Sequence, residues 1–304
     1  MNGLPWGDVD ALPMAEAIES VERALLDGLD PAADPPRRRA DVGDAGHFLL
    51  MPSGHGPRAG VKVATVAPGN AERGLPRIQG VYVLFDGETL TPVAFMDGAA
   101  ITALRTPAVS AVAAKHLVTG TPRRLLVFGT GPQAARHIEA LRVVLPSLEA
   151  VEVAGRDSAK AERFAAGHGA AVAGDRDAAV QAADVICCCT TAGEPLFDGA
   201  LVRDGATVIA VGSHEPHVRE LDAALMARAV VVVESLDTAM REAGDVVQAA
   251  DEGVLQPDDL VTIDALVRGQ ASDPLAPGRP RVFKSAGMSW EDLVVASAAW
   301  ERTR

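Results

Sequence analysis

The feature that most constrains the fold is an alternation of short apolar runs with helical segments, which begins at Arg123. The apolar runs are "RLLVFG", "AVEVAG", "AAVAG", "DVICCCT", "ATVIAVG" and "AVVVVES". Segments with helical spacing, such as "PQAARHIEALRVVL" and "RELDAALMARA", lie between them. Continuous apolar strands joined by helices must be covered on both faces. The pattern therefore predicts an α/β domain over residues 119–284, built on a doubly wound parallel sheet.

The remainder of the chain predicts a second domain, of α+β type, formed by residues 1–118 and 285–304. Apolar positions at helical spacing predict a helix within residues 11–29. The runs "HFLLMP", "GVKVATV", "IQGVYVLFD" and "TPVAFMD" then predict a mainly antiparallel sheet, with a hairpin at Asp86-Gly87. In "TPAVSAVAAKHL", Thr106 is the expected cap of a helix and Pro107 its first residue. The tail "SWEDLVVASAAWERT" predicts a final helix.

The stretch "LLVFGTGPQAARHI" joins the first strand of the parallel sheet to its helix. Its glycines and its alanine follow the G-x-G-x-x-G/A pattern, in which the first glycine permits a tight turn and the second a close approach of pyrophosphate. The phosphates would face the N-terminus of the helix. This Rossmann-type turn predicts dinucleotide binding by Gly129, Thr130, Gly131, Pro132, Gln133 and Ala134.

The end of the next strand, "VEVAGRD", bears on the choice of nucleotide. An acidic residue at its tip favours NAD(H), whereas here Arg156 comes first and its planar guanidinium suits a 2′-phosphate. Asp157 follows and competes for a ribose hydroxyl, and both residues also suit an exposed loop. We expect NADP(H) to be favoured over NAD(H). Further cofactor candidates at strand ends are Thr190, Thr191 and Gly212.

Composition excludes several classes of partner. The chain of 304 residues carries 28 Lys and Arg against 41 Asp and Glu, a net charge of −13, which disfavours nucleic acid and anionic membranes. No apolar segment has the length of a membrane span, and the N-terminus shows no signal peptide. The three cysteines, 187–189, are adjacent and lack zinc-type spacing. We expect no metal, and packing roles for these cysteines in a reducing cytoplasm.

Several segments together resemble the ornithine cyclodeaminase/μ-crystallin family, in order and over nearly the whole chain. They are "GVKVATVAPGN", "GLPRIQGVYVLFDGET", "MDGAAITALRTPAVSAVAAKHL", "VFGTGPQA", "GSHEPHVRELD" and "VFKSAGMSWED". The resemblance implies a homodimer in which the N-terminal part and the final helix carry the substrate site and the dimer sheet. It also implies hydride transfer between a nicotinamide and a carbon that bears an amine or imine.

The resemblance places a clamp for the substrate carboxylate on Arg37, Lys62 and Arg105, with Lys62 also in a catalytic role. An arginine binds a carboxylate through two parallel hydrogen bonds and so aligns a small 2-imino, 2-amino or 2-oxo acid. Arg37 is the least certain match because Arg38 and Arg39 follow it directly. The dense basic run also suits a solvated loop.

Position 214 departs from the cyclodeaminases of the family, which have an aspartate where this chain has His214 and then Glu215. A histidine exchanges protons near neutral pH but offers no fixed negative charge to an ammonium. This favours an NAD(P)H-dependent imine reductase or amino-acid dehydrogenase, with His214 catalytic. The alternatives are a cyclodeaminase that uses bound NAD and a crystallin-like NADP(H)-binding protein. Lys284 and Ser285 are expected near the cofactor, and Gly287 permits close backbone approach.

Overall fold

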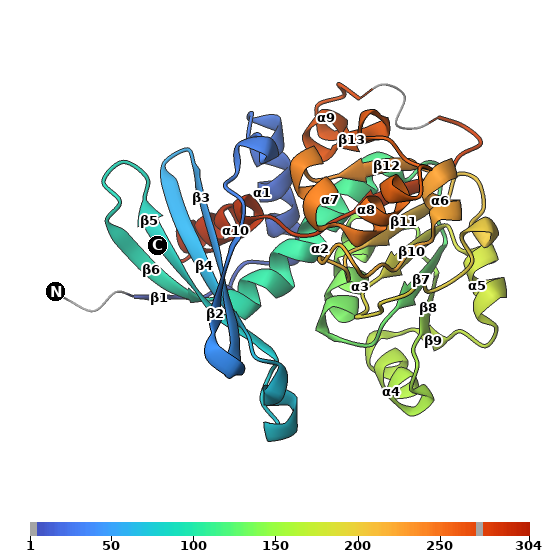
Figure 1. The fold of residues 1–304 in the computed structure, drawn as a ribbon, viewed down its shortest axis with the longest axis horizontal. Helices are drawn as coiled ribbons and strands as arrows, with labels where there is room; N and C mark the ends of the chain where they lie inside the picture. The colour runs from blue at the N-terminus through green and yellow to red at the C-terminus, as the bar shows by residue number, and fades with distance from the viewer. Residues whose placement is uncertain (1–4, 272–275) are drawn as a thin grey trace. The chain divides into compact units, whose positions relative to one another are not determined.

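The chain divides into two units in the computed structural model, which describes residues 5–271 and 276–304 (Figure 1). One unit contains the chain up to Thr106 together with Met288–Arg304, and the other contains Pro107–Gly287. The first boundary falls inside helix α2, Gly98–Leu117. The expected domain limits, at 118/119 and 284/285, lie near these two boundaries, and the first four residues of the expected N-terminal domain fall outside the described part.

The N-terminal unit is built on a six-stranded sheet in the order β1-β6-β5-β4-β3-β2. All its neighbouring strands are antiparallel except β1 and β6, which are parallel. The strands are β1 (Trp6–Gly7), β2 (Arg38–Val42), β3 (Gly46–His55), β4 (Arg58–Val66), β5 (Ile78–Asp86) and β6 (Pro92–Asp97), and two helices belong with them, α1 (Met14–Leu26) and α10 (Ser289–Arg302). The predicted mainly antiparallel sheet is confirmed.

One face of this sheet is buried because α10 packs against β3, β4 and β5, and α1 packs against α10. Successive side chains of a strand point to opposite faces. In register across the sheet, Met51, Lys62, Tyr82 and Met96 form one buried row. Strand alternation therefore places a lysine among apolar side chains, where it needs a charged partner.

The expected start of the helix at Thr106 is wrong. Helix α2 begins at Gly98, and Oδ1 of Asp97 accepts hydrogen bonds from the amides of Ala99 and Ala100 at 2.7 and 3.1 Å. Pro107 consequently lies inside α2. A proline inside a helix loses one backbone hydrogen bond and its ring crowds the carbonyl four residues earlier, so local propensity places Pro107 at a helix start. The tertiary structure overrides that preference here.

The second unit contains an eight-stranded parallel sheet in the order β13-β12-β14-β11-β10-β7-β8-β9 (Figure 1). This confirms the predicted doubly wound sheet. Its strands are β7 (Arg124–Phe128), β8 (Ala150–Ala154), β9 (Ala171–Val172), β10 (Val185–Cys188), β11 (Thr207–Ala210), β12 (Val230–Val233), β13 (Leu260–Thr262) and β14 (Arg281–Lys284). Its helices, besides part of α2, are α3 (Pro132–Val144), α4 (Ser158–His168), α5 (Arg176–Ala182), α6 (Ala223–Arg228), α7 (Leu236–Glu242), α8 (Gly244–Asp251) and α9 (Ile263–Val267).

The late strand β14 lies between β11 and β12, although it is the last of the eight in the chain. Every residue of β14 is buried, including Lys284 at its carboxyl end. The insertion brings the segment after Lys284 to the edge where β10 and β11 also end. In an open parallel sheet this is the edge at which ligands bind.

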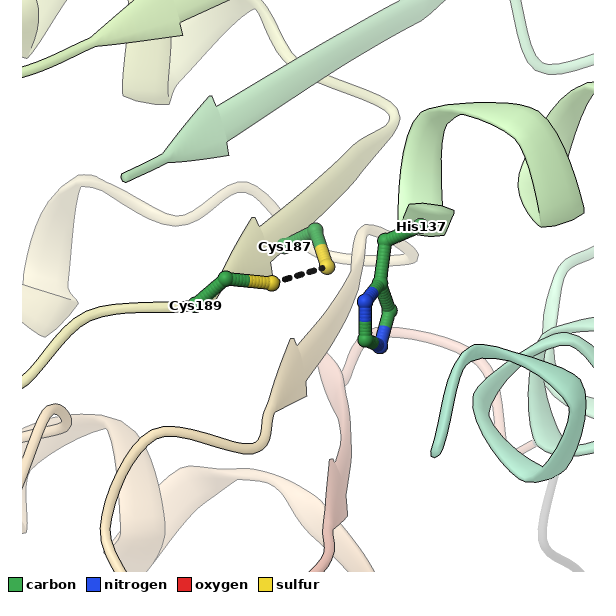
Figure 2. A group of neighbouring side chains, drawn as sticks. All are labelled: His137, Cys187 and Cys189. Carbon is green, nitrogen blue, oxygen red and sulfur yellow. Dashed lines mark hydrogen bonds between the residues drawn. The ribbon is translucent and has the colours of Figure 1, made fainter. Parts of the chain in front are cut away.

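The three cysteines are free thiols and occupy the end of β10. Cys188 packs in the hydrophobic core between the sheet and its helices. Cys187 and Cys189 point the other way, towards His137 of α3 (Figure 2). The predicted packing role therefore fits Cys188, whereas the thiols of Cys187 and Cys189 lie beside the imidazole of His137. Among the helices of the described residues, none is long and apolar enough to cross a membrane.

Candidate active site

The glycine turn after β7 has the geometry that a bound dinucleotide requires. Gly129 has a φ of +117°, and a Cβ there would lie 2.5 Å from the carbonyl oxygen of Cys189. Gly131 is the N-cap of α3, and a Cβ added to it would meet nothing within 4 Å. The first glycine is therefore required by the fold, while the second leaves space beside the helix N-terminus, where phosphate is favoured.

A pocket of about 300 Å³ opens at these strand ends. It is lined by Phe128, Gly129, Thr130, Gly131, Ala154, Gly155, Arg156, Lys160, Arg176, Cys189, Thr190, Thr191, Ala192 and Leu196. Six of the residues predicted to contact the cofactor are in this lining, namely Gly129, Thr130, Gly131, Arg156, Thr190 and Thr191. Pro132, Gln133 and Ala134 form the first turn of α3, where Ala134 is fully buried.

The rim of the pocket is basic. Arg156, Lys160 and Arg176 all line it, and among the described residues none of them forms an ion pair with an acid. Asp157 has a different role, because its Oδ1 accepts a hydrogen bond from the amide of Lys160 at 2.9 Å and caps α4. Sequence reasoning missed Lys160 and Arg176, which belong to the helices that follow β8 and β9.

Two of the predicted residues are joined by a carboxylate that the sequence analysis did not single out. Oε1 of Glu220 accepts hydrogen bonds from the amide and the hydroxyl of Thr190, at 2.8 and 2.7 Å. Its Oε2 accepts one from the amide of Gly212 at 2.7 Å. Burial raises the pKa of Glu220, an effect that the Lys284 ammonium and the Thr190 bonds oppose. Glu220 thereby holds the loops after β10 and β11 together.

Lys284 lies in a second buried network next to this one. Its Nζ donates to the carbonyl oxygen of Ser213 at 2.7 Å and to the Ser213 hydroxyl at 3.0 Å, and lies 2.9 Å from Oδ2 of Asp245. Burial opposes ionisation of Asp245, but Lys284 and the Ser213 hydroxyl outweigh it, so the pKa of Asp245 is lowered. An ammonium has three N–H donors, and three protein oxygens surround this one.

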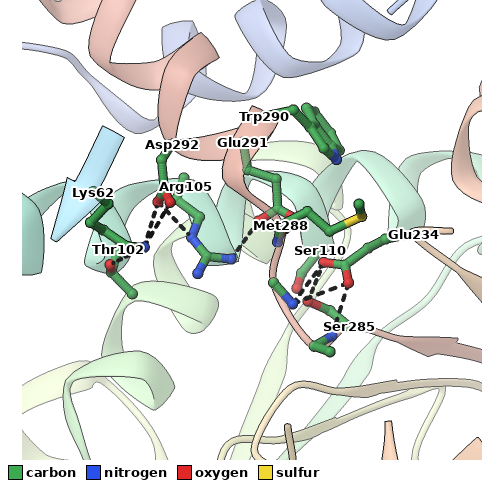
Figure 3. Close-up of polar contacts among 12 residues, drawn as sticks. Lys62, Thr102, Arg105, Ser110, Glu234, Ser285, Met288, Trp290, Glu291 and Asp292 are labelled. Atoms are coloured by element: carbon green, nitrogen blue, oxygen red, sulfur yellow. Dashed lines mark hydrogen bonds and ion pairs between the residues drawn. The ribbon is translucent and has the colours of Figure 1, made fainter. Parts of the chain in front are cut away.

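The segment after Lys284 is held by Glu234 at the end of β12. The Ser285 hydroxyl donates to Oε1 of Glu234 at 2.6 Å, and the amides of Ala286 and Gly287 donate to the same carboxylate (Figure 3). Gly287 has a φ of +79°, in the left-handed region that favours glycine. The structure therefore places Ser285 and Gly287 in a backbone turn around a buried carboxylate.

His214 and Glu215 lie on the exposed loop after β11. The Glu215 carboxylate is 3.2 Å from Nε2 of His217, so its charge is directed towards a surface neighbour. The residue before His214, Ser213, is buried and donates a hydrogen bond to Oδ2 of Asp245 at 2.6 Å. The buried network thus holds the base of the loop while His214 stays at the surface.

In the N-terminal unit, the two predicted cations of the clamp meet the same helix. Nζ of Lys62 lies 2.7 Å from Oδ2 of Asp292 and donates to the Thr102 hydroxyl at 3.1 Å. Arg105 pairs through NH1 with Glu291, and its Nε lies 3.2 Å from Oδ1 of Asp292 (Figure 3). Both carboxylates are fully buried on α10. The structure therefore brings Lys62 and Arg105 together, with two acids that set their orientation.

Burial shifts the titration of this cluster. It lowers the pKa of Lys62 to about 8, with Asp292 opposing the shift and Arg105 adding to it. Burial raises the pKa of Asp34 to about 6, although its carboxylate accepts a hydrogen bond from the amide of Trp290 at 2.9 Å. The hydroxyl of Tyr82 is buried without a hydrogen-bond partner among the described residues. A lysine with a pKa near neutrality can both bind an anion and exchange a proton.

Arg37 is half-buried directly before β2, and Arg38 and Arg39 are exposed within that strand. Nε of Arg39 pairs with Oδ1 of Asp41 at 2.8 Å, on the surface. Of the three arginines, Arg37 is thus the most shielded from solvent. Its part in a carboxylate clamp stays a prediction.

Sequence reasoning missed five buried carboxylates that organise these sites. A signal was available for some of them, since acids stood next to continuous apolar runs in "AVVVVES" and "SWEDLVV". Buried acids are costly unless they are paired, so such positions indicate a cation elsewhere in the chain. The five are Glu220, Glu234, Asp245, Glu291 and Asp292.

A family model described as the ornithine cyclodeaminase/mu-crystallin family matches residues 9–304. The chain is 35% identical over 264 residues to a Δ1-pyrroline-2-carboxylate reductase of Bacillus cereus, covering 84% of this chain and 81% of the relative. It is 36% identical over 246 residues to the ketimine reductase mu-crystallin of Rattus norvegicus, covering 79% and 74%.

The fold is similar to a solved structure of Δ1-pyrroline-2-carboxylate reductase from Thermococcus litoralis in complex with NADH and L-proline. The TM-score is 0.90 and the sequence identity is 29%, and the match covers 99% of this chain and 97% of the other. Together with the glycine turn and its pocket, this likeness supports pyridine nucleotide binding.

Proposed function

Because the chain belongs to the ornithine cyclodeaminase/mu-crystallin family, we propose that it is an NAD(P)H-dependent reductase of a small 2-imino acid. The preferred substrate class is a cyclic imine that carries a carboxylate next to the C=N bond, of the Δ1-pyrroline-2-carboxylate kind. Two similar relatives are named as reductases of imines. In the reverse direction the same chemistry oxidises a 2-amino acid.

The observation that carries the proposal is the buried pair of cations formed by Lys62 and Arg105. A 2-imino acid presents a carboxylate that must be fixed before its neighbouring carbon can accept a hydride. Arg105 suits the carboxylate as a planar fork, and its orientation is set by Glu291 and Asp292. Glu291 and Asp292 are thus positioning residues, which orient the cations that bind the substrate carboxylate.

A bound nicotinamide supplies the hydride, and the protein supplies position and protons. Lys62 is the group best suited to give a proton to the imine or to take one from it. Its pKa of about 8 allows both protonation states near neutrality. Asp292 lies 2.7 Å from its Nζ and favours the charged form. His214 remains a second candidate for proton transfer, from the exposed loop after β11.

We further propose that NADPH is preferred over NADH. Arg156, Lys160 and Arg176 line one pocket, and three cations suit a 2′-phosphate better than a ribose hydroxyl. Asp157, which would compete for that hydroxyl, is used as the cap of α4. Titration of the purified protein with each nucleotide tests this directly, and tighter binding of NADH would overturn it.

The activity is tested by following nicotinamide absorbance with Δ1-pyrroline-2-carboxylate and either nucleotide. We expect NADPH to be consumed and proline to be formed in equal amounts. A set of 2-oxo acids supplied with ammonia or methylamine extends the test to open-chain imines. Tight NADPH binding without turnover of any imine would instead support the crystallin-like alternative.

Ornithine separates the reductase from a cyclodeaminase. A cyclodeaminase must hold a side-chain ammonium, which a carboxylate does by charge pairing. Position 214 is a histidine, and Glu215 is paired with His217 on the surface. We therefore expect no ammonia or proline from ornithine with NAD. Their formation at constant total NAD would contradict the reductase proposal.

We propose that the protein is a homodimer and works in the cytoplasm. Val42 and Phe48 are large apolar residues on one face of the six-stranded sheet and are exposed, and exposed apolar side chains on one face of a sheet favour association. The free cysteines suit a reducing compartment. Sedimentation equilibrium tests the dimer, and a monomer at micromolar concentration would overturn it.

A further inference from the structure

His137, Cys187 and Cys189 form a cluster that the proposed reaction does not use. Their ligand atoms all lie within 4.8 Å of one another, and no ion is needed to bring them together (Figure 2). We propose that this cluster is a binding site for a thiophilic metal ion, with Zn²⁺ as the ordinary occupant and Cd²⁺ as a close analogue. The proposal does not depend on which imine the protein reduces.

Two elements of the second unit build the site. Cys187 lies in β10 and Cys189 directly follows the last residue of that strand, and the two thiols face the same side because the alternation of the strand continues. Cys188 points to the opposite face and packs in the core. His137 is fully buried on α3, which follows the neighbouring strand β7. The spacing of the cysteines in the sequence does not reveal this site, because its histidine comes from a different element, α3.

The distance between the sulfur atoms fits a shared metal. Sγ of Cys187 lies 3.5 Å from Sγ of Cys189. With Zn–S bonds of about 2.3 Å in a tetrahedral site, two thiolates on one Zn²⁺ lie about 3.8 Å apart. A shift of a few tenths of an ångström, on the order of ordinary thermal displacement, therefore brings the two sulfur atoms to a coordinating distance.

The imidazole of His137 is already oriented by the protein. Its Nδ1 lies 2.8 Å from the carbonyl oxygen of Gln133, and its Nε2 lies 3.0 Å from the hydroxyl of Ser110. A metal takes one ring nitrogen, and the other then keeps an oxygen partner that holds its N–H. Such an outer hydrogen bond fixes the tautomer of a metal-ligating histidine and is a regular feature of zinc sites.

Protons must leave when the ion binds. Burial raises the pKa of both Cys187 and Cys189, so both are thiols in the metal-free protein. Binding breaks two S–H bonds, forms two metal–sulfur bonds and one metal–nitrogen bond, and passes two protons to solvent. Cys189 is only half-buried and lines the nucleotide pocket, which provides the path of entry. Water from that pocket completes the four-coordinate shell.

The test is a titration of the reduced, metal-free protein with Cd²⁺, followed by the ultraviolet charge-transfer absorbance of cadmium thiolates. We expect saturation at one ion per chain, with Zn²⁺ displacing Cd²⁺. Cys187→Ala and Cys189→Ala should each weaken binding by more than about 100-fold, because loss of an outer-shell partner alone costs about 10- to 100-fold. His137→Gln should weaken binding while the thiolate absorbance persists.

Cys188→Ala is the matched control, since it removes a neighbouring thiol that faces the core. It should bind Cd²⁺ as the wild type does. Circular dichroism establishes that each variant is folded, and Cys189→Ala, at the half-buried position, carries the test if Cys187→Ala does not fold. Absence of saturable binding, or equal loss in the Cys188→Ala control, would overturn the proposal.

Discussion

The two units each bury a lysine against carboxylates, but among the described residues only the lysine of the N-terminal unit shares its carboxylate with a second cation. Lys284 is surrounded by three protein oxygens, and its partner Asp245 also accepts hydrogen bonds from the amides of Glu220 and Leu221. Lys62 also has three protein oxygens around its Nζ, both carboxylate oxygens of Asp292 and the hydroxyl of Thr102, but it shares Asp292 with a second cation, Arg105. Burial alone does not distinguish them, since both lysines are almost completely enclosed.

The difference indicates which network is structural and which can act on a ligand. Three protein oxygens surround each ammonium, so the number of oxygen partners does not separate the two networks either. Burial lowers the pKa of Lys62 and the neighbouring Arg105 adds to that shift, so Lys62 can exchange a proton near neutral pH. We therefore propose that Lys284 positions the loop after β11 and that Lys62 acts on substrate.

The largest effect is expected from Lys284→Met. This change leaves Asp245 buried without its cation, and the free energy of unfolding should fall by about 3–5 kcal/mol. Urea denaturation followed by circular dichroism measures it. The double variant Lys284→Met/Asp245→Asn should not recover wild-type stability, because one amide oxygen cannot replace a carboxylate that accepts two backbone amides and a hydroxyl. Full recovery would show that the pair is only an ion pair.

Lys62→Met and Arg105→Leu should each lower kcat/KM by about 100-fold or more, because a charge-assisted contact with the substrate carboxylate is lost. The dissociation constant of NADPH, measured by fluorescence, should barely change. Lys62→Met also strands Asp292, so Lys62→Met/Asp292→Asn is the control for folding. We expect this double variant to regain stability but not activity. Wild-type kinetics in both single variants would contradict the proposed carboxylate clamp.

The third effect is a dependence of kcat/KM on pH that is set by the titration of Lys62. If its ammonium is required, kcat/KM should fall about tenfold per pH unit above the pKa of about 8. Because the folded pKa lies below the unfolded value of about 10.4, the unfolded chain binds more protons between these values, and Lys62 makes the fold more stable as pH rises there. Loss of activity in this window is therefore not unfolding.

Lys62→Arg provides the control for this profile, since a guanidinium stays charged throughout the range. Its activity is expected to be lower overall but flat from about pH 8 to about pH 10 on this scale of pKa values. A limb near pH 8 that persists in Lys62→Arg would assign the titration to another group, with His214 tested next by His214→Ala.

The smallest effect concerns the cations of the nucleotide pocket, which pair with no acid among the described residues. Arg156→Ala should reduce the preference for NADPH over NADH by about tenfold, within the range for one hydrogen bond to a charged group. Asp157→Ala is the matched control, since it removes the α4 cap and should cost about 1 kcal/mol of stability without changing the preference. A larger change of the NADPH preference in Asp157→Ala than in Arg156→Ala would show that Asp157, and not Arg156, contacts the ribose.

The sequence alone determined the layers of the fold and predicted where the nucleotide binds. Period-two runs and continuous apolar strands report burial directly, because each residue must match its own solvent environment. The spacing of glycines in the sequence likewise identified Gly129, whose positive φ only glycine adopts readily, and Gly131, beside which the structure leaves open space. Local propensity failed at the start of α2, where Pro107 satisfies the rules for a helix start and yet lies inside the helix.

Only the tertiary structure decided which charges meet. Lys62 and Asp292 are separated by 230 positions, and Arg105 and Glu291 by 186. No local pattern encodes such pairs, because the energy of a buried charge depends on partners brought close by the packing of whole elements. For the same reason, the sequence did not predict that His137 lies beside Cys187 and Cys189, or that β14 lies between β11 and β12. Sequence periodicity records how far each residue is buried, whereas the identity of its neighbours is a property of the fold.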